Sequence, residues 1–190
     1  MGQIQMAVRM LEKKDEYTRG HSQRVSRYAT KTAALLGFTG IMLEQIRLGG
    51  ELHDIGKIGT RDEVLRKRGP LTPFEFEEMK KHVLEGEEIL APLRREHPIV
   101  LQIVRSHHER LDGSGFPDRL RGVTIPLPAR IVAVVDAFDA MTTERSYRNP
   151  RTAEDAMNEL RRFAGVQFDG DVVAAFQRAF PDPGKLPISV

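Results

Sequence analysis

The chain has 190 residues, 40% of them hydrophobic and 29% charged, which is enough to bury the core of one globular domain. Its 29 basic and 27 acidic residues leave a net charge of +2, so the overall charge does not favour nucleic acid as a partner. The absence of cysteine excludes disulfides, cysteine-ligated zinc and iron–sulfur clusters, so a bound metal must take histidine and carboxylate ligands.

Apolar residues recur at helical spacing almost throughout, which predicts an all-α fold: a single-domain helical bundle with one long loop rich in glycine and proline. No apolar run is long enough for a membrane span, and the first residues lack a signal-peptide pattern, so we expect a cytoplasmic protein. We divide the chain into an N-terminal amphipathic helix or linker (1–14), a main domain (15–180) and a C-terminal tail (181–190).

The first expected helix covers 3–14 and is too short to be stable alone. It either packs on the main domain or continues a helix from an upstream segment. We therefore expect signal input from an upstream sensor or receiver domain, or a homodimer contact.

Two further helices are expected over 18–36 and 40–54. Their inner faces place His21 and His53 among apolar residues. In the second of these helices, Gly49 and Gly50 each cost about 1 kcal/mol against alanine, a cost that is tolerated where another backbone must come close.

The remaining helices are expected from Thr72 to Pro92, over 97–109, over 129–136, over 152–164 and over 169–180, with a long loop at 110–128. The face of the helix after Thr72 that we expect to be buried comprises Phe76, Met79, His82, Val83, Gly86, Ile89 and Leu90. The segment 129–136 is rich in β-branched residues, so a buried strand is its alternative.

Seven side chains on five predicted helices could converge on one site. They are His21, His53, Asp54, His82, His107, His108 and Asp136. A lone histidine on an apolar face is more often a core residue, but the whole set favours a metal-dependent hydrolase. Two divalent cations about 3.5–4 Å apart can clamp a phosphodiester, whereas His97 lies outside the pattern and is expected at the surface.

Three more features fit such a site. Lys57 follows Asp54 by three residues and could contact a phosphate as a point charge. Arg145 and Arg148 could face one way and hold phosphate or guanine, although a solvated loop end is an equal alternative. Gly113 and Gly115, in the long loop, are expected to adopt backbone angles that other residues avoid.

The sequence resembles a known family in several of its motifs. The run from His53 to Lys57 (HDIGK) resembles the signature of HD-superfamily phosphohydrolases, and the run from His107 to Pro117 (HHERLDGSGFP) resembles the second signature of the HD-GYP subfamily. The stretches 17–22 and 142–148 are also similar to this subfamily. The resemblance implies an all-α domain that hydrolyses the bacterial messenger cyclic di-GMP to pGpG or GMP, at a binuclear or trinuclear site that usually holds iron or manganese.

The resemblance also implies residue roles. All seven candidate ligands match family metal ligands, with Asp54 bridging two divalent ions, iron or manganese, and a metal-bridging hydroxide as the nucleophile. Asp54 and Lys57 would be catalytic, and the substrate contacts would be Lys57, Arg145, Arg148, Gly113 and Phe116.

Two positions depart from the family pattern. Phe116 replaces the tyrosine of the motif, so it keeps an aromatic ring for stacking but loses the hydroxyl. Tyr17 stands where trinuclear members carry a glutamate, which favours two metals over three. Two alternatives stay open: a module that binds a cyclic dinucleotide without hydrolysing it, and an HD hydrolase of another nucleotide.

Overall fold

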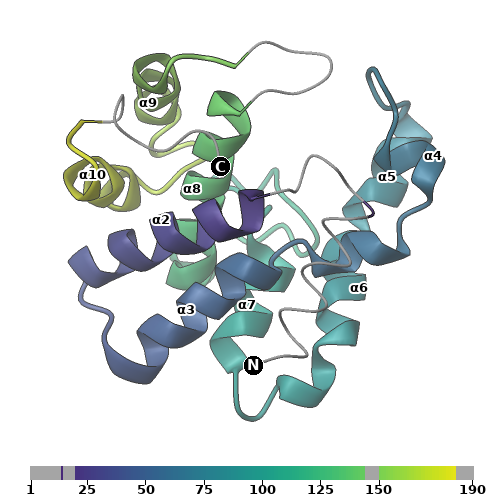
Figure 1. Cartoon of the computed structure of the whole chain (residues 1–190), viewed down its shortest axis with the longest axis horizontal. Coiled ribbons are helices and arrows are strands. Elements are labelled where there is room, and N and C mark those ends of the chain that lie inside the picture. Colours follow the sequence, from purple (N-terminus) through teal and green to yellow (C-terminus); the bar gives the residue numbers. More distant parts are fainter. Residues whose placement is uncertain (1–13, 15–19, 144–149, 183–190) are drawn as a thin grey trace.

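The computed structural model describes residues 14, 20–143 and 150–182, and these form a helical bundle (Figure 1). The α-helices are α2 (His21–Leu35), α3 (Gly40–Leu52), α4 (Asp62–Leu65), α5 (Pro73–Lys80), α6 (His82–Ile89), α7 (Pro98–Ser106), α8 (Leu127–Thr142), α9 (Ala153–Arg162) and α10 (Gly170–Ala179). Short 3₁₀ turns are η2 (Ile55–Gly59), η3 (Ala91–Leu93) and η4 (Gly122–Thr124). The described residues contain no strand, and the all-α prediction is confirmed.

Helix α8 is the centre of the bundle. It packs against α2 and α7 and also contacts α9 and α10, which lie together at one side of the molecule (Figure 1). Its valines and isoleucine are buried because they face neighbours on several sides, so the helix is apolar almost all round. The prediction of a buried helix over 129–136 is confirmed, and the strand alternative is wrong.

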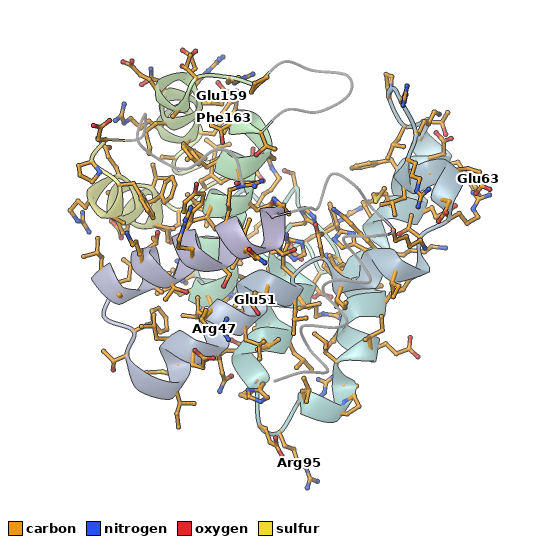
Figure 2. The ribbon with its side chains drawn as sticks, viewed as in Figure 1. Arg47, Glu51, Glu63, Arg95, Glu159 and Phe163 are labelled. Atoms are coloured by element: carbon orange, nitrogen blue, oxygen red, sulfur yellow. The ribbon has the colours of Figure 1, made fainter. Side chains whose placement is uncertain are left out.

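Helices α2 and α3 pack unusually closely. A Cβ at Gly50 would lie 2.7 Å from the Cα of Ser26, so only glycine allows this approach of the two backbones. The Ser26 hydroxyl donates a hydrogen bond of 2.7 Å to the Arg47 carbonyl oxygen and fixes the contact. Farther along α3, Arg47 pairs with Glu51 at the surface (Figure 2). The prediction that the glycine pair serves a close backbone approach is therefore confirmed at Gly50.

The segment after Thr72 forms two helices rather than the one predicted. Thr72 caps α5 in a reciprocal capping box with Glu75, and the helix ends at Lys80, so that one residue, Lys81, separates it from α6. The expectation that Phe76 and Ile89 are buried is wrong, since they are 48% and 45% exposed. The apolar spacing continues across the break, and periodicity alone did not reveal it.

Two apolar clusters hold the bundle together. The larger one joins α2, α8, α9 and α10 around Tyr28, Phe138 and Phe176, whose rings meet edge to face. The smaller one joins α3 and α7 to η2 through Leu52, Ile55 and Val104 among others. This second cluster fixes the ends of α3 and α7, where several candidate ligands lie.

The expected helix over 3–14 lies outside the described residues except for Lys14. The Lys14 ammonium donates hydrogen bonds of 2.5 Å to the Ile58 carbonyl oxygen and 2.7 Å to that of Thr60. His97 is half-buried rather than fully at the surface. No helix in the described part of the chain is long and apolar enough to cross a membrane.

Candidate metal centre

The candidate ligands come mostly from helix ends. His21 and His82 are the first residues of α2 and α6, while His53 and His107 cap the C-termini of α3 and α7. Their neighbours Asp54 and His108 follow directly in the chain, and Asp136 comes from the middle of the central helix α8. Since a side chain at a helix end is less crowded by its own helix, five separate elements can meet at one point.

Four of the histidines are oriented in the same way. The Nδ1 atom of His53 donates to the Gly50 carbonyl oxygen at 2.9 Å, and that of His82 donates to the Met79 carbonyl oxygen at 2.7 Å. His107 Nδ1 donates to the carbonyl oxygen of Ile103 at 3.1 Å. His21 Nδ1 lies 2.7 Å from the Asp139 carboxylate. Each ring therefore engages Nδ1 in a hydrogen bond and directs Nε2 toward the site, the arrangement expected of metal-binding histidines.

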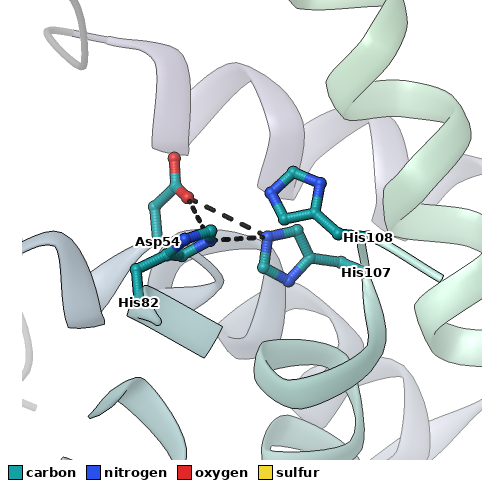
Figure 3. Close-up of side chains that lie close together, drawn as sticks. All are labelled: Asp54, His82, His107 and His108. Atoms are coloured by element: carbon teal, nitrogen blue, oxygen red, sulfur yellow. Dashed lines mark hydrogen bonds and ion pairs between the residues drawn. The ribbon is translucent and has the colours of Figure 1, made fainter. Parts of the chain in front are cut away.

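The seven side chains form two groups, in each of which the possible ligand atoms lie within 4.8 Å of one another. One group contains Asp54, His82, His107 and His108, and the other contains His21, His53 and Asp136. Figure 3 shows the first group, with the Asp54 carboxylate above His82 and the His108 ring above that of His107.

Asp54 connects the two groups through its two carboxylate oxygens. Oδ1 lies 3.4 Å from His82 Nε2 and 3.9 Å from His107 Nε2. Oδ2 faces the second group, at 3.4 Å from His53 Nε2 and 3.9 Å from His21 Nε2. One carboxylate between two histidine sets is the geometry required of a bridging ligand.

The protonation of the site suits cation binding. Burial lowers the pKa of His82 to about 3, and burial together with neighbouring imidazoles holds the pKa of His107 well below its usual value. Burial acts in the same direction on His53, but the Asp54 charge outweighs it and raises the pKa of His53 to about 9. Burial would raise the pKa of Asp54, yet Lys57 and His53 hold it well below the usual range. The carboxylate is therefore ionised, and most of the imidazoles are neutral.

Such an arrangement requires a cation to be fully stabilised. The Nε2 atoms of His82 and His107 lie 3.5 Å apart with both Nδ1 protons already donated, so two lone pairs face each other. His53 Nε2 is buried and has no hydrogen-bond partner within the described part of the chain. Imidazole and carboxylate donors suit first-row transition metals, and the residues fit a pair of divalent ions.

Sequence reasoning missed a supporting pair beneath these ligands. The Asp139 carboxylate accepts a hydrogen bond from His21 Nδ1. It also accepts hydrogen bonds from Arg24, of 2.6 Å from Nε and 3.0 Å from Nη2. Burial would raise the pKa of Asp139, but the hydrogen bonds from His21 and Arg24 hold it below the usual value. The available signal was a second aspartate one helical turn after Asp136, and an arginine at the same spacing from His21.

Lys57 folds back toward the site. Its ammonium donates a hydrogen bond of 2.6 Å to Oδ2 of Asp54. Gly56 allows this turn because its backbone presses on α6: a Cβ there would lie 1.9 Å from the His82 carbonyl oxygen. The turn at Gly56 therefore brings η2, and with it Asp54, close to His82.

A cavity of about 800 Å³ opens beside the candidate ligands. His107, His108 and Asp136 form its floor, and the loop carrying Gly113 and Phe116 forms one wall. The opposite wall is α5.

The cavity's loop wall is fixed from below. The buried Glu109 carboxylate accepts backbone hydrogen bonds from Asp118 at 2.7 Å and Leu120 at 3.0 Å. Gly113 has φ +77° as expected. The expected special backbone angle at Gly115 is wrong, because its φ is not in the left-handed region. Glycine is needed there because a Cβ would lie 2.5 Å from the Glu109 Cα and from the Arg110 nitrogen.

Arg145, Arg148 and Tyr17 lie outside the described residues. Their expected roles in substrate binding and in the number of metals therefore stay predictions.

Comparison with known proteins decides the family, because a model described as an HD domain matches residues 5–172. The chain belongs to the HD domain family. A cyclic di-GMP phosphodiesterase from Thermotoga maritima is 42% identical over 168 residues, covering 87% of this chain and 45% of that protein. The cyclic di-GMP phosphodiesterase response regulator RpfG from Xanthomonas campestris is 40% identical over 90% of this chain and 45% of that protein.

Solved HD domain structures agree with the fold. Bd1817, an HDG"Y"P protein from Bdellovibrio bacteriovorus, gives a TM-score of 0.69 at 21% identity, over 85% of this chain and 51% of that chain. The PgpH HD domain from L. monocytogenes, solved in complex with cyclic-di-AMP, gives 0.65 at 19% identity over 95% of each chain. The resemblance to HD-GYP proteins within the HD domain family is confirmed.

Proposed function

We propose that this HD domain is a metal-dependent phosphodiesterase that hydrolyses cyclic di-GMP to pGpG or GMP. The observation that carries the proposal is one buried carboxylate, Asp54, placed between two histidine groups, three of whose members, His107, His108 and Asp136, line a cavity. The names of the Thermotoga and Xanthomonas relatives support the same substrate.

In this proposal seven residues hold two divalent ions, iron or manganese. His82, His107 and His108 would hold one ion, His21, His53 and Asp136 would hold the other, and Asp54 would contribute to both. The bound ions would neutralise charge on the scissile phosphate and lower the pKa of an attacking water.

The other proposed roles belong to the protein's own side chains. Lys57 holds Asp54 through its ammonium and offers a positive charge to a phosphate oxygen as negative charge develops there. Asp139 keeps His21 in the tautomer that presents Nε2. The substrate contacts of the proposal are Lys57, Gly113 and Phe116 together with Arg145 and Arg148.

A mixed cyclic dinucleotide is the second candidate substrate. A 3'3'-cGAMP-specific phosphodiesterase from Vibrio cholerae is 39% identical over 86% of this chain and 31% of that protein. A module that binds without hydrolysis is disfavoured, because such a module has no need of a complete set of seven candidate metal ligands.

The chain spans less than half the length of the curated relatives it matches. We therefore assign catalysis to residues 15–180 and propose that an upstream sensor or receiver, or a homodimer contact through residues 1–14, controls it. Residues 181–190 form a tail in this proposal, and the domain acts in the cytoplasm on its messenger.

Incubation of the purified protein with cyclic di-GMP and Mn²⁺ or Fe²⁺ tests the proposal. We expect conversion to pGpG or GMP, with 3'3'-cGAMP hydrolysed more slowly in the same assay. The Asp54→Asn variant should lose the activity, whereas Glu44→Gln, an exposed change on α3, should retain it. Protein that binds cyclic di-GMP but leaves it intact would refute hydrolysis. Faster turnover of 3'3'-cGAMP than of cyclic di-GMP would make the mixed cyclic dinucleotide the preferred substrate.

A further inference from the structure

Helix α5 presents an aromatic ring to the cavity and not to the core. None of its residues is buried. It is held by exposed ion pairs, such as Arg61 Nη2 to Glu78 at 2.6 Å. Phe76 is 48% exposed yet lines the cavity whose floor carries His107 and His108. A phenylalanine that contributes so little to the core is free to contact a ligand.

Three rings continue from α5 to the metal centre. Phe76 meets Phe116 edge to face, with centroids 6.4 Å apart and an interplanar angle of 82°. Phe116 in turn stacks on His108, with centroids 4.9 Å apart and an angle of 28°. His108 closes one face of the Phe116 ring, and the two phenylalanines form an aromatic corner on the cavity wall.

Lys80 adds a positive charge to the same corner. Its ammonium lies 5.4 Å from the Phe76 centroid and 5.8 Å from the Phe116 centroid. It is also paired with Glu77 at 2.6 Å on the rim of the cavity. A cation held above two rings sits where the edge of a planar ligand stacked on either ring would come.

Nucleobases are the ligands that this combination suits. Aromatic side chains bind bases by stacking. A lysine distinguishes guanine, whose O6 and N7 are both acceptors, from adenine, whose N6 amino group is a donor. The purine must be close to the metal centre, because Phe116 packs directly on a candidate ligand, His108.

We propose that Phe76, Phe116 and Lys80 form a guanine subsite, in which the base stacks in the aromatic corner and Lys80 reads its O6 and N7 edge. This inference rests on the proposed function, since it assigns the base of the nucleotide whose phosphate would lie at the metal centre. It makes α5 the element that selects guanine over adenine.

Calorimetric titration with a phosphorothioate analogue of cyclic di-GMP, which resists hydrolysis, tests the subsite in the metal-loaded protein. Phe76→Ala should weaken binding about tenfold or more, and Phe76→Trp should restore it. Phe74→Ala is the matched control, because Phe74 is also on α5 and 75% exposed but does not line the cavity. Metal content should be the same in all of these proteins.

Lys80→Met should reduce the preference for the cyclic di-GMP analogue over the cyclic di-AMP analogue by about tenfold. Equal binding by Phe76→Ala and Phe74→Ala, or an unchanged preference in Lys80→Met, would overturn the subsite. A wild-type protein that binds the analogue through Phe76 but never hydrolyses cyclic di-GMP would refute the proposed phosphodiesterase and leave the subsite supported.

Discussion

At the scale of single residues, Asp139 determines how His21 meets the metal centre. The side chains of Asp139 and Arg24 are 3% and 5% exposed, so each charge depends on the other. Asp139→Ala leaves the Arg24 charge buried without its partner and should lower the unfolding free energy by about 3–5 kcal/mol, measured by urea denaturation. Glu44→Ala breaks an exposed pair with Arg47 and should cost less than about 1 kcal/mol. Equal losses in the two variants would contradict this role.

The buried histidines predict how the metal-free protein responds to pH. Burial lowers the pKa of His82 to about 3 and also lowers the pKa values of His107 and His108. In the unfolded chain the pKa of a histidine is about 6.5. These three contribute stability that is complete above the unfolded pKa and is lost as pH falls toward the folded values. His53 has the opposite effect, because burial lowers its pKa but the Asp54 charge raises it to about 9. Its contribution to stability is complete below about pH 6.5 and is lost as the pH rises through about 9.

Because three depressed groups outweigh one raised group below neutrality, the unfolding free energy should fall between pH 7 and pH 5. Each extra proton on the unfolded chain contributes about 1.4 kcal/mol per pH unit. Urea titrations in EDTA measure the slope, and His82→Asn should make it shallower by about one such unit. A stability that rises on acidification would contradict the assigned protonation states.

The residue roles were predictable only in part. All seven candidate ligands could be found in the sequence, because two signatures and the helical spacing indicated them. Arg24 and Asp139 could not, because their role exists only where α2 meets α8. The aromatic corner was missed for a related reason: Phe76 follows the spacing of a core residue, and only the packed structure leaves its ring exposed.

At the scale of elements, the contact between η2 and α6 sets the distance between Asp54 and His82. Gly56→Ala would place a methyl group 1.9 Å from the His82 carbonyl oxygen and 2.5 Å from the Gly86 nitrogen. We expect a loss of about 1–3 kcal/mol from overpacking, accompanied by a loss of bound metal.

Gly170→Ala is the control for this prediction, because its nearest neighbour, the Ala164 Cβ, is 4.0 Å away. It should keep its metal and be as stable as the wild type or slightly more so. Chemical denaturation and metal analysis of both variants check the prediction. A Gly56→Ala protein with full metal content would show that η2 can move away from α6 without disturbing the site.

Helices with a continuous buried stripe, such as α2 and α3, were predicted well from periodicity, whereas α8 was predicted only over 129–136 and extends to Thr142. The division between α5 and α6 was not predicted, because the apolar spacing continues through Lys81. The structural difference between the two helices is that Gly56 and Gly86 bring η2 against α6 and not against α5. The 3₁₀ turn η2 and the four-residue helix α4 are too short to carry a periodic signal of their own.

At the scale of the whole molecule, the metal centre joins five separate elements, so bound metal should stabilise the entire bundle. An ion that binds only the folded state at a hundredfold excess over its Kd adds about 2.7 kcal/mol. Removal of metal with EDTA should therefore lower the melting temperature, and it should lower that of Asp54→Asn by much less. Identical melting temperatures with and without EDTA would show that the ligands do not hold the bundle together.

The all-α class and the presence of a site were predictable at this scale, but the division of the ligands into two groups was not. Which oxygen of Asp54 faces which histidines depends on how α3, α6 and α7 cross, and no local pattern encodes that crossing.

The most direct test of the centre is the metal content of protein purified without oxygen, paired with cyclic di-GMP turnover, in the wild type and in His53→Ala. Because Asp54 lies between two groups of candidate ligands, we expect two equivalents of iron or manganese and measurable turnover in the wild type. His53→Ala should lose at least one equivalent and the activity. A wild type that binds no more than one equivalent, or a His53→Ala protein that keeps both ions and full activity, would contradict the account.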